Sequence, residues 1–275
     1  TTEEIFILIN QDKKSIHLEK FKKFPKSFKN DKLNNKWEEL KKIRDVCNIS
    51  IEEKRASKEI GSSLEANLII NLNEKLFNIT EKTKYIMPTH LNGRIADMKP
   101  IINIAEKHGL KIVEDSAQSL GARYDGKHGG SFGLGGCISF YPAKVLGCLG
   151  DGGAVLTNNE EIYKRVISLR DHGRSEFGVY DLWGRNSRLD NLQAAFLNVQ
   201  FERYPSVIKR RRSLARKYGE LLGNISDITL PPMPDESKTH FDIFQNFEIM
   251  ATNRDELVAF LKQNGIGTIN QWGGL

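Results

Sequence analysis

The chain has 275 residues, of which 39% are hydrophobic and 28% charged, as in ordinary folded proteins of one large or two smaller domains. Its three cysteines, Cys47, Cys137 and Cys148, form no C-x-x-C pair, which argues against a disulfide framework or a zinc site. No apolar run reaches membrane-spanning length and the acidic start is not a signal peptide, so we expect a cytoplasmic protein with no membrane contact.

The formal net charge is +6, which raises the question of an anionic partner. Most basic residues are spread along the chain, as on a solvated surface. Residues 20–29 are the exception, because lysines alternate there with phenylalanines. Interleaved basic and aromatic side chains are typical of RNA-binding segments, so an RNA contact remains an alternative for residues 20–29.

The amino-acid composition of the chain changes near residue 83, and Gly61 is the only glycine before that point. Thr2 can cap a short helix over residues 2–9. A longer helix is predicted over residues 35–59, and residues 66–72 read as a strand. The longer helix should bury one stripe, formed by Trp37, Leu40, Ile43, Val46, Cys47 and Ile51.

After residue 83, helices and strands alternate. Helices are predicted over residues 96–108, 159–170, 188–203, 204–222 and 253–264. Strands are predicted over residues 110–114, 137–141, 154–157 and 241–250. This alternation indicates an α/β domain with a mainly parallel sheet, in which ligands bind beyond the carboxyl ends of strands. Asp115 and Lys144 both follow predicted strands.

A lysine amine can bond covalently to an aldehyde cofactor, and a carboxylate can tune the far end of such a ring. Lys144 and Asp115 supply these two groups. Taken singly, each has a simpler explanation, because lysines after strands are usually on the surface and aspartates there usually cap helices. The motifs around them favour the functional interpretation.

Residues from about 85 to 275 resemble the DegT/DnrJ/EryC1/StrS sugar aminotransferases, which have fold type I and depend on pyridoxal 5'-phosphate (PLP). The resemblance rests on several motifs in the family's order: PTHLNG (88–93), IVEDSAQ (112–118), GSFG (130–133), SFYPAK (139–144), GDGGA (150–154), LRDHGR (169–174) and NSRLDNLQAA (186–195). It implies amino transfer, usually from glutamate, to a keto group of a nucleotide-linked sugar by a homodimer. The tail over residues 265–274 is similar to members that act on dTDP-linked 3-keto-6-deoxy sugars.

The resemblance also implies a role for each matched side chain. Lys144 would form the Schiff base with PLP and move protons, and Asp115 would pair with the pyridine nitrogen. Gln118 would lie against the ring near its phenolic oxygen. Ser139 would bind the phosphate, and Asn186 would reach the phosphate of the neighbouring subunit's cofactor.

The first part resembles isoleucyl-tRNA synthetase in the helical region after its anticodon-binding bundle. The matching stretches are residues 15–21, 37–48, 53–55 and 60–66. They imply a weak tRNA contact at most. No synthetase activity follows, because neither catalytic signature of that enzyme is present. Packing alone is the simpler role for this segment.

We therefore expect an incomplete fold type I large domain (84–223) with a partial small domain (224–275), preceded by a mainly helical segment (1–83). The family's opening phosphate loop has no counterpart, so we expect a truncated or fused chain that binds PLP weakly or not at all. The alternatives are a tRNA-binding fragment and a fusion without function.

Overall fold

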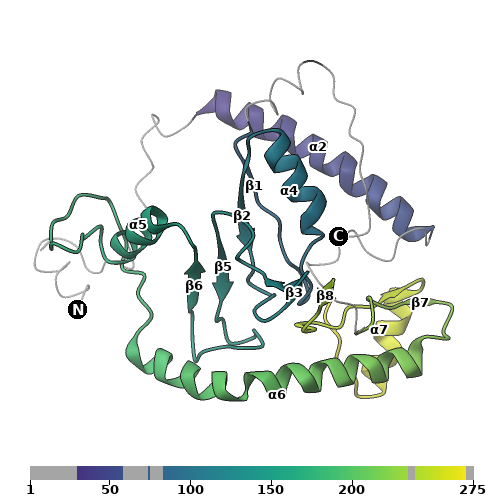
Figure 1. Cartoon of the computed structure of the whole chain (residues 1–275). Coiled ribbons are helices and arrows are strands. Elements are labelled where there is room, and N and C mark those ends of the chain that lie inside the picture. The colour runs from purple at the N-terminus through teal and green to yellow at the C-terminus, as the bar shows by residue number, and fades with distance from the viewer. Residues whose placement is uncertain (1–29, 58–73, 75–82, 235–238, 271–275) are drawn as a thin grey trace, which may run out of the picture.

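The computed structural model of the chain describes residues 30–57, 74, 83–234 and 239–270 (Figure 1). The predicted helix over residues 2–9 and the predicted strand over residues 66–72 lie outside these ranges. The basic segment 20–29 lies outside them as well, so its RNA contact stays a prediction.

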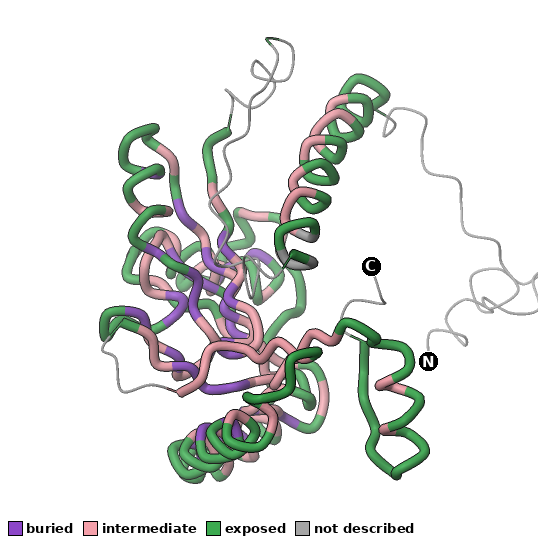
Figure 2. Tube along the Cα trace, turned by 90° about the vertical axis from the view of Figure 1, so that its right-hand side faces the viewer, coloured by how far each residue is buried: buried purple, intermediate pink, exposed green. Residues whose placement is uncertain are grey.

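The N-terminal helix α2 spans Asp31–Ala56, four residues before the predicted start. The side chain of Asn30 begins it by accepting a hydrogen bond from Leu33 N at 2.9 Å. The predicted burial of its apolar stripe is wrong, because Trp37 is 56% exposed and Val46 64%. In Figure 2 the helix carries only exposed and intermediate positions where its burial is described, since no described element covers the stripe.

A four-stranded sheet forms the centre of the molecule, in the order β1 (Tyr85–Ile86), β2 (Lys111–Asp115), β5 (Gly135–Ser139) and β6 (Gly153–Leu156). The first three strands are parallel, and β6 runs antiparallel to β5. The mainly parallel sheet predicted from the sequence is therefore confirmed. Helix α4 (Met98–Lys107) is the crossover between β1 and β2, and α5 (Glu160–Arg170) follows β6.

A small antiparallel sheet connects the end of the chain to this core. Strands β3 (Arg123–Tyr124) and β4 (Lys127–His128) form a hairpin. Its turn residues Asp125 and Gly126 have φ of 47° and 80°, as a two-residue hairpin turn requires. Strand β8 (His240–Phe241) pairs with β3, while β7 (Ile228–Thr229) pairs with β9 (Met250–Ala251). Helix α7 (Arg254–Gln263) closes the described part where a helix was predicted.

One continuous helix, α6 (Asn191–Leu222), replaces the two helices predicted over residues 188–203 and 204–222. Pro205 lies inside it, although proline removes a helical hydrogen bond. Packing on both sides of the proline explains why the helix continues. Tyr204 is buried and donates its hydroxyl to Leu120 O at 2.5 Å, and Ile208 packs against the core.

The long strand predicted over residues 241–250 is wrong, because only its first and last residues belong to strands. Phe244 has φ of 54°, which interrupts an extended chain. Two arginines of α6 donate hydrogen bonds to carbonyl groups in the stretch between the first and last residues. Arg212 donates to Asp242 O at 2.8 Å, and Arg211 donates to Phe244 O and Gln245 O at 2.9 and 3.1 Å.

Two apolar clusters share a boundary at the turn that carries Lys144. One includes Ile95, Met98 and Ile243, and the other includes Leu146 and Tyr204. Val145 packs against both. Within the described ranges, none of the helices combines the length and the apolarity that a membrane crossing requires.

Candidate active site

The carboxyl ends of two parallel strands bring Asp115 and Ser139 to one edge of the sheet. Asp115 is the last residue of β2 and Ser139 the last of β5. The register pairs Asp115 with Cys137, two residues before Ser139. Because side chains alternate along a strand, Asp115 and Ser139 point to the same face.

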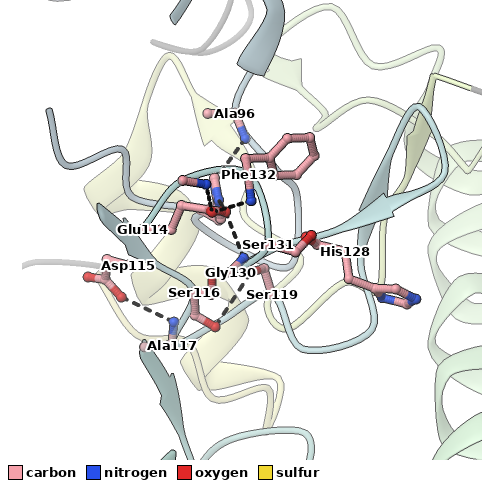
Figure 3. Close-up of polar contacts among 12 residues, drawn as sticks. Ala96, Glu114, Asp115, Ser116, Ala117, Ser119, His128, Gly130, Ser131 and Phe132 are labelled. Carbon is pink, nitrogen blue, oxygen red and sulfur yellow. Dashed lines mark hydrogen bonds and ion pairs between the residues drawn. The ribbon is translucent and has the colours of Figure 1, made fainter. Parts of the chain in front are cut away.

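The carboxylate of Asp115 is half-buried and only partly engaged. Its Oδ1 accepts a hydrogen bond from Ala117 N at 3.1 Å, as Figure 3 shows, and Oδ2 has no partner among the described residues. Its backbone is fixed by Pro88 O at 3.0 Å and His90 N at 2.9 Å. The position is therefore rigid, with one carboxylate oxygen left to accept a further hydrogen bond.

Lys144 lies in a turn just after β5, where its amide donates to Tyr141 O at 2.8 Å. The residue is half-buried, and its Nζ forms no hydrogen bond or ion pair within the described part of the chain. It lines a small pocket together with Gln118 and Ser139. Three of the five predicted site residues thus meet at one pocket, beside the strand end that carries Asp115.

Gln118 is held in one orientation, because its Oε1 accepts the backbone N–H of Asn92 at 2.8 Å. Its amide NH₂ group therefore remains as a donor. Ser139 Oγ accepts from Tyr141 N at 3.2 Å, so its hydroxyl hydrogen is available for another acceptor. The pocket consequently presents an amine, an amide donor and a hydroxyl donor.

Asn186 does not lie with the other four. It is exposed in the loop after α5, where it forms a β-bridge with Asp171. Arg188 joins the two by donating to Asn186 Oδ1 at 3.2 Å and pairing with Asp171 Oδ1 at 3.0 Å. The hydrogen bond from Arg174, together with the charges of Arg174 and Arg188, holds the pKa of Asp171 below its usual range. Asn186 thus has a defined but separate position.

A buried polar cluster supports the strand end from the opposite face of the sheet (Figure 3). Glu114 accepts the N–H groups of Gly130, Phe132 and Gly133 at 2.6, 2.6 and 3.0 Å. His90 Nε2 lies 2.9 Å from its carboxylate, while His90 Nδ1 accepts from Ala96 N at 3.2 Å. Because Nδ1 accepts, Nε2 carries the proton and donates it to Glu114.

Two pocket residues carry no sequence signal that points to them. Tyr204 and Gln245 line the same pocket as Lys144, yet lie 60 and 101 residues further along the chain. Burial raises the pKa of Tyr204 to about 12, so its hydroxyl keeps its proton and donates to Leu120 O. Tyr204 is therefore part of the wall rather than an acid or base.

The sheet, the crossover helix and the lysine beyond the strand ends together define a fold type I PLP aminotransferase architecture, preceded here by a helical segment. A solved structure of Streptomyces venezuelae DesV, in complex with a ketimine intermediate, matches 70% of this chain and 53% of its own, with a TM-score of 0.64 and 38% identity. The sequence profile of the DegT/DnrJ/EryC1/StrS aminotransferase family matches residues 66–272. The chain belongs to this family.

Individual relatives agree with this assignment. A pleiotropic regulatory protein of Geobacillus stearothermophilus is 42% identical over 192 residues, which are 70% of this chain and 51% of that protein. A UDP-N-acetyl-3-dehydro-α-D-glucosamine 3-aminotransferase of Acidithiobacillus ferrooxidans is 40% identical over 190 residues, 69% of this chain and 50% of that enzyme. The chain therefore spans about half the length of these relatives.

A different protein matches a shorter stretch. The isoleucine–tRNA ligase of Pelagibacter ubique is 68% identical over 85 residues, which are 31% of this chain and 9% of that enzyme. The resemblance of the first part to isoleucyl-tRNA synthetase is thereby confirmed. One chain thus carries similarity to two unrelated enzymes.

Proposed function

We propose that this chain carries the cofactor half of a PLP-dependent sugar aminotransferase site, with Lys144 as the lysine that bonds to PLP. One observation supports this most directly. The Lys144 amine has no partner among the described residues and shares its pocket with Gln118 and Ser139. An amine left unpaired in a partly enclosed pocket is suited to attack an aldehyde.

The donors and acceptors fit the chemistry of PLP. Asp115 has a carboxylate oxygen to accept from a protonated ring nitrogen, and Gln118 has an amide donor for the ring oxygen. Ser139 supplies a hydroxyl for the phosphate, and Asn186 would serve the phosphate in a neighbouring copy. When bound, PLP supplies an electron sink. Lys144 would hold the aldehyde carbon of the cofactor through Nζ, with release of water, and would give and take protons at that nitrogen.

The substrate of this site would be a keto group on a nucleotide-linked sugar, with glutamate as the amino donor. The names of relatives that act on UDP- and dTDP-linked sugars support the first part of this proposal. We further propose a homodimer, because Asn186 lies away from the Lys144 pocket of its own chain and would serve the site of the neighbouring copy. The proposed location is the cytoplasm. The division into residues 1–83, 84–223 and 224–275 belongs to the same proposal.

The decisive test is covalent trapping of PLP on Lys144. The protein is incubated with millimolar PLP, because weak affinity is expected, and then reduced with borohydride and digested. Mass spectrometry should find the label on Lys144, and Lys144→Ala should lose both this label and the visible absorption band. Lys164→Ala, which changes an exposed lysine of α5, is the matched control. Equal labelling of surface lysines without preference for Lys144 would reject the proposal.

A second candidate function is tRNA binding through the first part of the chain, favoured by the 68% identity to isoleucine–tRNA ligase. Binding of this kind would weaken steeply with salt. Titration of the full chain with tRNA at two salt concentrations tests it, and binding that is absent or independent of salt would reject it.

A further inference from the structure

The side chain of Gln245 holds the backbone on both sides of Lys144. Its Oε1 accepts from Val145 N at 2.9 Å, and its Nε2 donates to Ala143 O at 2.9 Å. One amide group thus pairs with the two neighbours of the lysine. Gln245 also lines the pocket into which Lys144 is built.

Gln245 is itself fixed, so it can impose a position on its partners. Arg211 donates to the carbonyl of Gln245 at 3.1 Å and to that of Phe244 at 2.9 Å. On the other side, a Cβ atom at Gly93 would lie 2.6 Å from Gln245 N, so only glycine permits this approach. The backbone of Gln245 is therefore held between α6 and the loop at Gly93.

The same segment reaches Gln118 through one intermediate residue. Asn246 Nδ2 donates to Asn92 Oδ1 at 2.9 Å, and Asn92 N donates to Gln118 Oε1 at 2.8 Å. Two adjacent residues, about 100 positions after Lys144, thus contact the surroundings of two pocket groups. Gln245 contacts the two neighbours of Lys144 directly, whereas Asn246 reaches Gln118 only through Asn92. The effect on Lys144 is therefore the more direct one.

We propose that Gln245 is a positioning residue for Lys144, which fixes where the amine lies in the pocket. The inference rests on the proposed function, in which Lys144 is the cofactor lysine. At the lysine itself, the turn from Tyr141 to Val145 has one other anchor, the hydrogen bond that Lys144 N donates to Tyr141 O. Loss of two hydrogen bonds would let the lysine sample other orientations, and misplaced reactive groups react more slowly.

The test compares Gln245→Ala with Gln193→Ala in the full chain. Gln193 is a matched control, because its Oε1 accepts from Leu149 N at 2.7 Å and so anchors the loop that follows the Lys144 turn, not the turn itself. We expect PLP trapping on Lys144 to slow about tenfold in Gln245→Ala and to stay unchanged in Gln193→Ala. We also expect the pH midpoint of the visible PLP band to shift only in Gln245→Ala, which loss of stability alone would not produce.

Gln245→Glu provides a second variant of nearly the same shape. It keeps an acceptor for Val145 N but places a carboxylate against Ala143 O, so slower trapping and a shifted midpoint are again expected. It decides the question if Gln245→Ala does not fold. Trapping at the wild-type rate and pH midpoint in a folded Gln245 variant would overturn the positioning role alone. No trapping in the unmodified chain would overturn the proposed function and this inference with it.

Discussion

Glu114 is fully buried beneath the strand end that carries Asp115, and it is surrounded by hydrogen-bond donors. Burial by itself raises the pKa of this carboxyl. The hydrogen bonds from His90, Gly130, Phe132 and Gly133 outweigh burial, and the pKa lies below its usual value. The carboxylate therefore stabilises the fold above its unfolded-state pKa, and this contribution is lost as the pH falls through the folded-state pKa.

Glu114→Gln should lower the free energy of unfolding by about 2–4 kcal/mol at pH 7, because the new NH₂ group would face N–H donors in a buried site. The difference from wild type should shrink as the pH falls below the ordinary pKa of a glutamate side chain, because the unfolded wild-type chain binds a proton there before the folded chain does, and it should fade further as the pH falls through the lowered folded-state pKa. Urea unfolding across this pH range measures both effects.

Glu106→Gln is the control for Glu114→Gln, because Glu106 is exposed on α4 and should change little. A Glu114→Gln variant as stable as wild type at pH 7 would show that the buried cluster does not support the strand end.

The loop between α5 and α6 carries Asn186, and its conformation determines where Asn186 lies. Gly173 is buried in it with φ of +84°, and an added Cβ would lie 1.7 Å from Leu182 O. Two backbone hydrogen bonds connect the two sides of the loop: His172 N donates to Arg185 O at 2.9 Å, and Arg185 N donates to Leu169 O at 2.7 Å. Close backbone packing thus determines its conformation.

Gly173→Ala should therefore open this loop, and Gly178→Ala should not. Gly178 has a similar φ of +78° in the same loop, but nothing lies within 4 Å of an added Cβ. Both variants bear the cost of a left-handed residue, about 1 kcal/mol, and only Gly173→Ala adds a clash with backbone. Amide hydrogen exchange of His172 and Arg185 should accelerate at least about tenfold in Gly173→Ala alone. Equal exchange in the two variants would contradict the steric explanation.

The sequence predicts those elements whose pattern is local. Helices α4 and α7 and the parallel strands β2 and β5 lie close to where apolar spacing and glycines put them. The continuity of α6 through Pro205 is not local, because it depends on Tyr204 and Ile208 packing against distant residues. The segment 242–249 likewise departs from its strand pattern because arginines of α6 take its carbonyls.

The candidate site divides in the same way. Asp115, Gln118, Ser139 and Lys144 lie within 30 residues of one another in recognisable motifs, so a family resemblance can find them. Gln245 has no motif of its own, and its contact with the Lys144 turn spans about 100 residues. Glu114 stands inside a motif, but the sequence alone does not show its three backbone donors.

At the scale of the whole molecule, the central sheet ends in a strand that has one partner among the described residues. Strand β6 pairs with β5, and its outer edge has no described neighbour. Val155 in this strand is 46% exposed, and Leu156 is 39% exposed. An apolar strand edge of this kind is a template for pairing with another chain.

We therefore expect concentration-dependent self-association through β6, which Val155→Lys should reduce. A lysine on an edge strand opposes edge-to-edge pairing, because its charge would have to be buried against the incoming strand. Sedimentation velocity over a range of protein concentrations should show species that grow with concentration for the unmodified chain, and fewer and smaller such species for Val155→Lys. Ile104→Lys is the matched control, since Ile104 is 51% exposed but lies on helix α4. Association that persists in Val155→Lys, or that Ile104→Lys lowers equally, would mean that another surface holds the copies together.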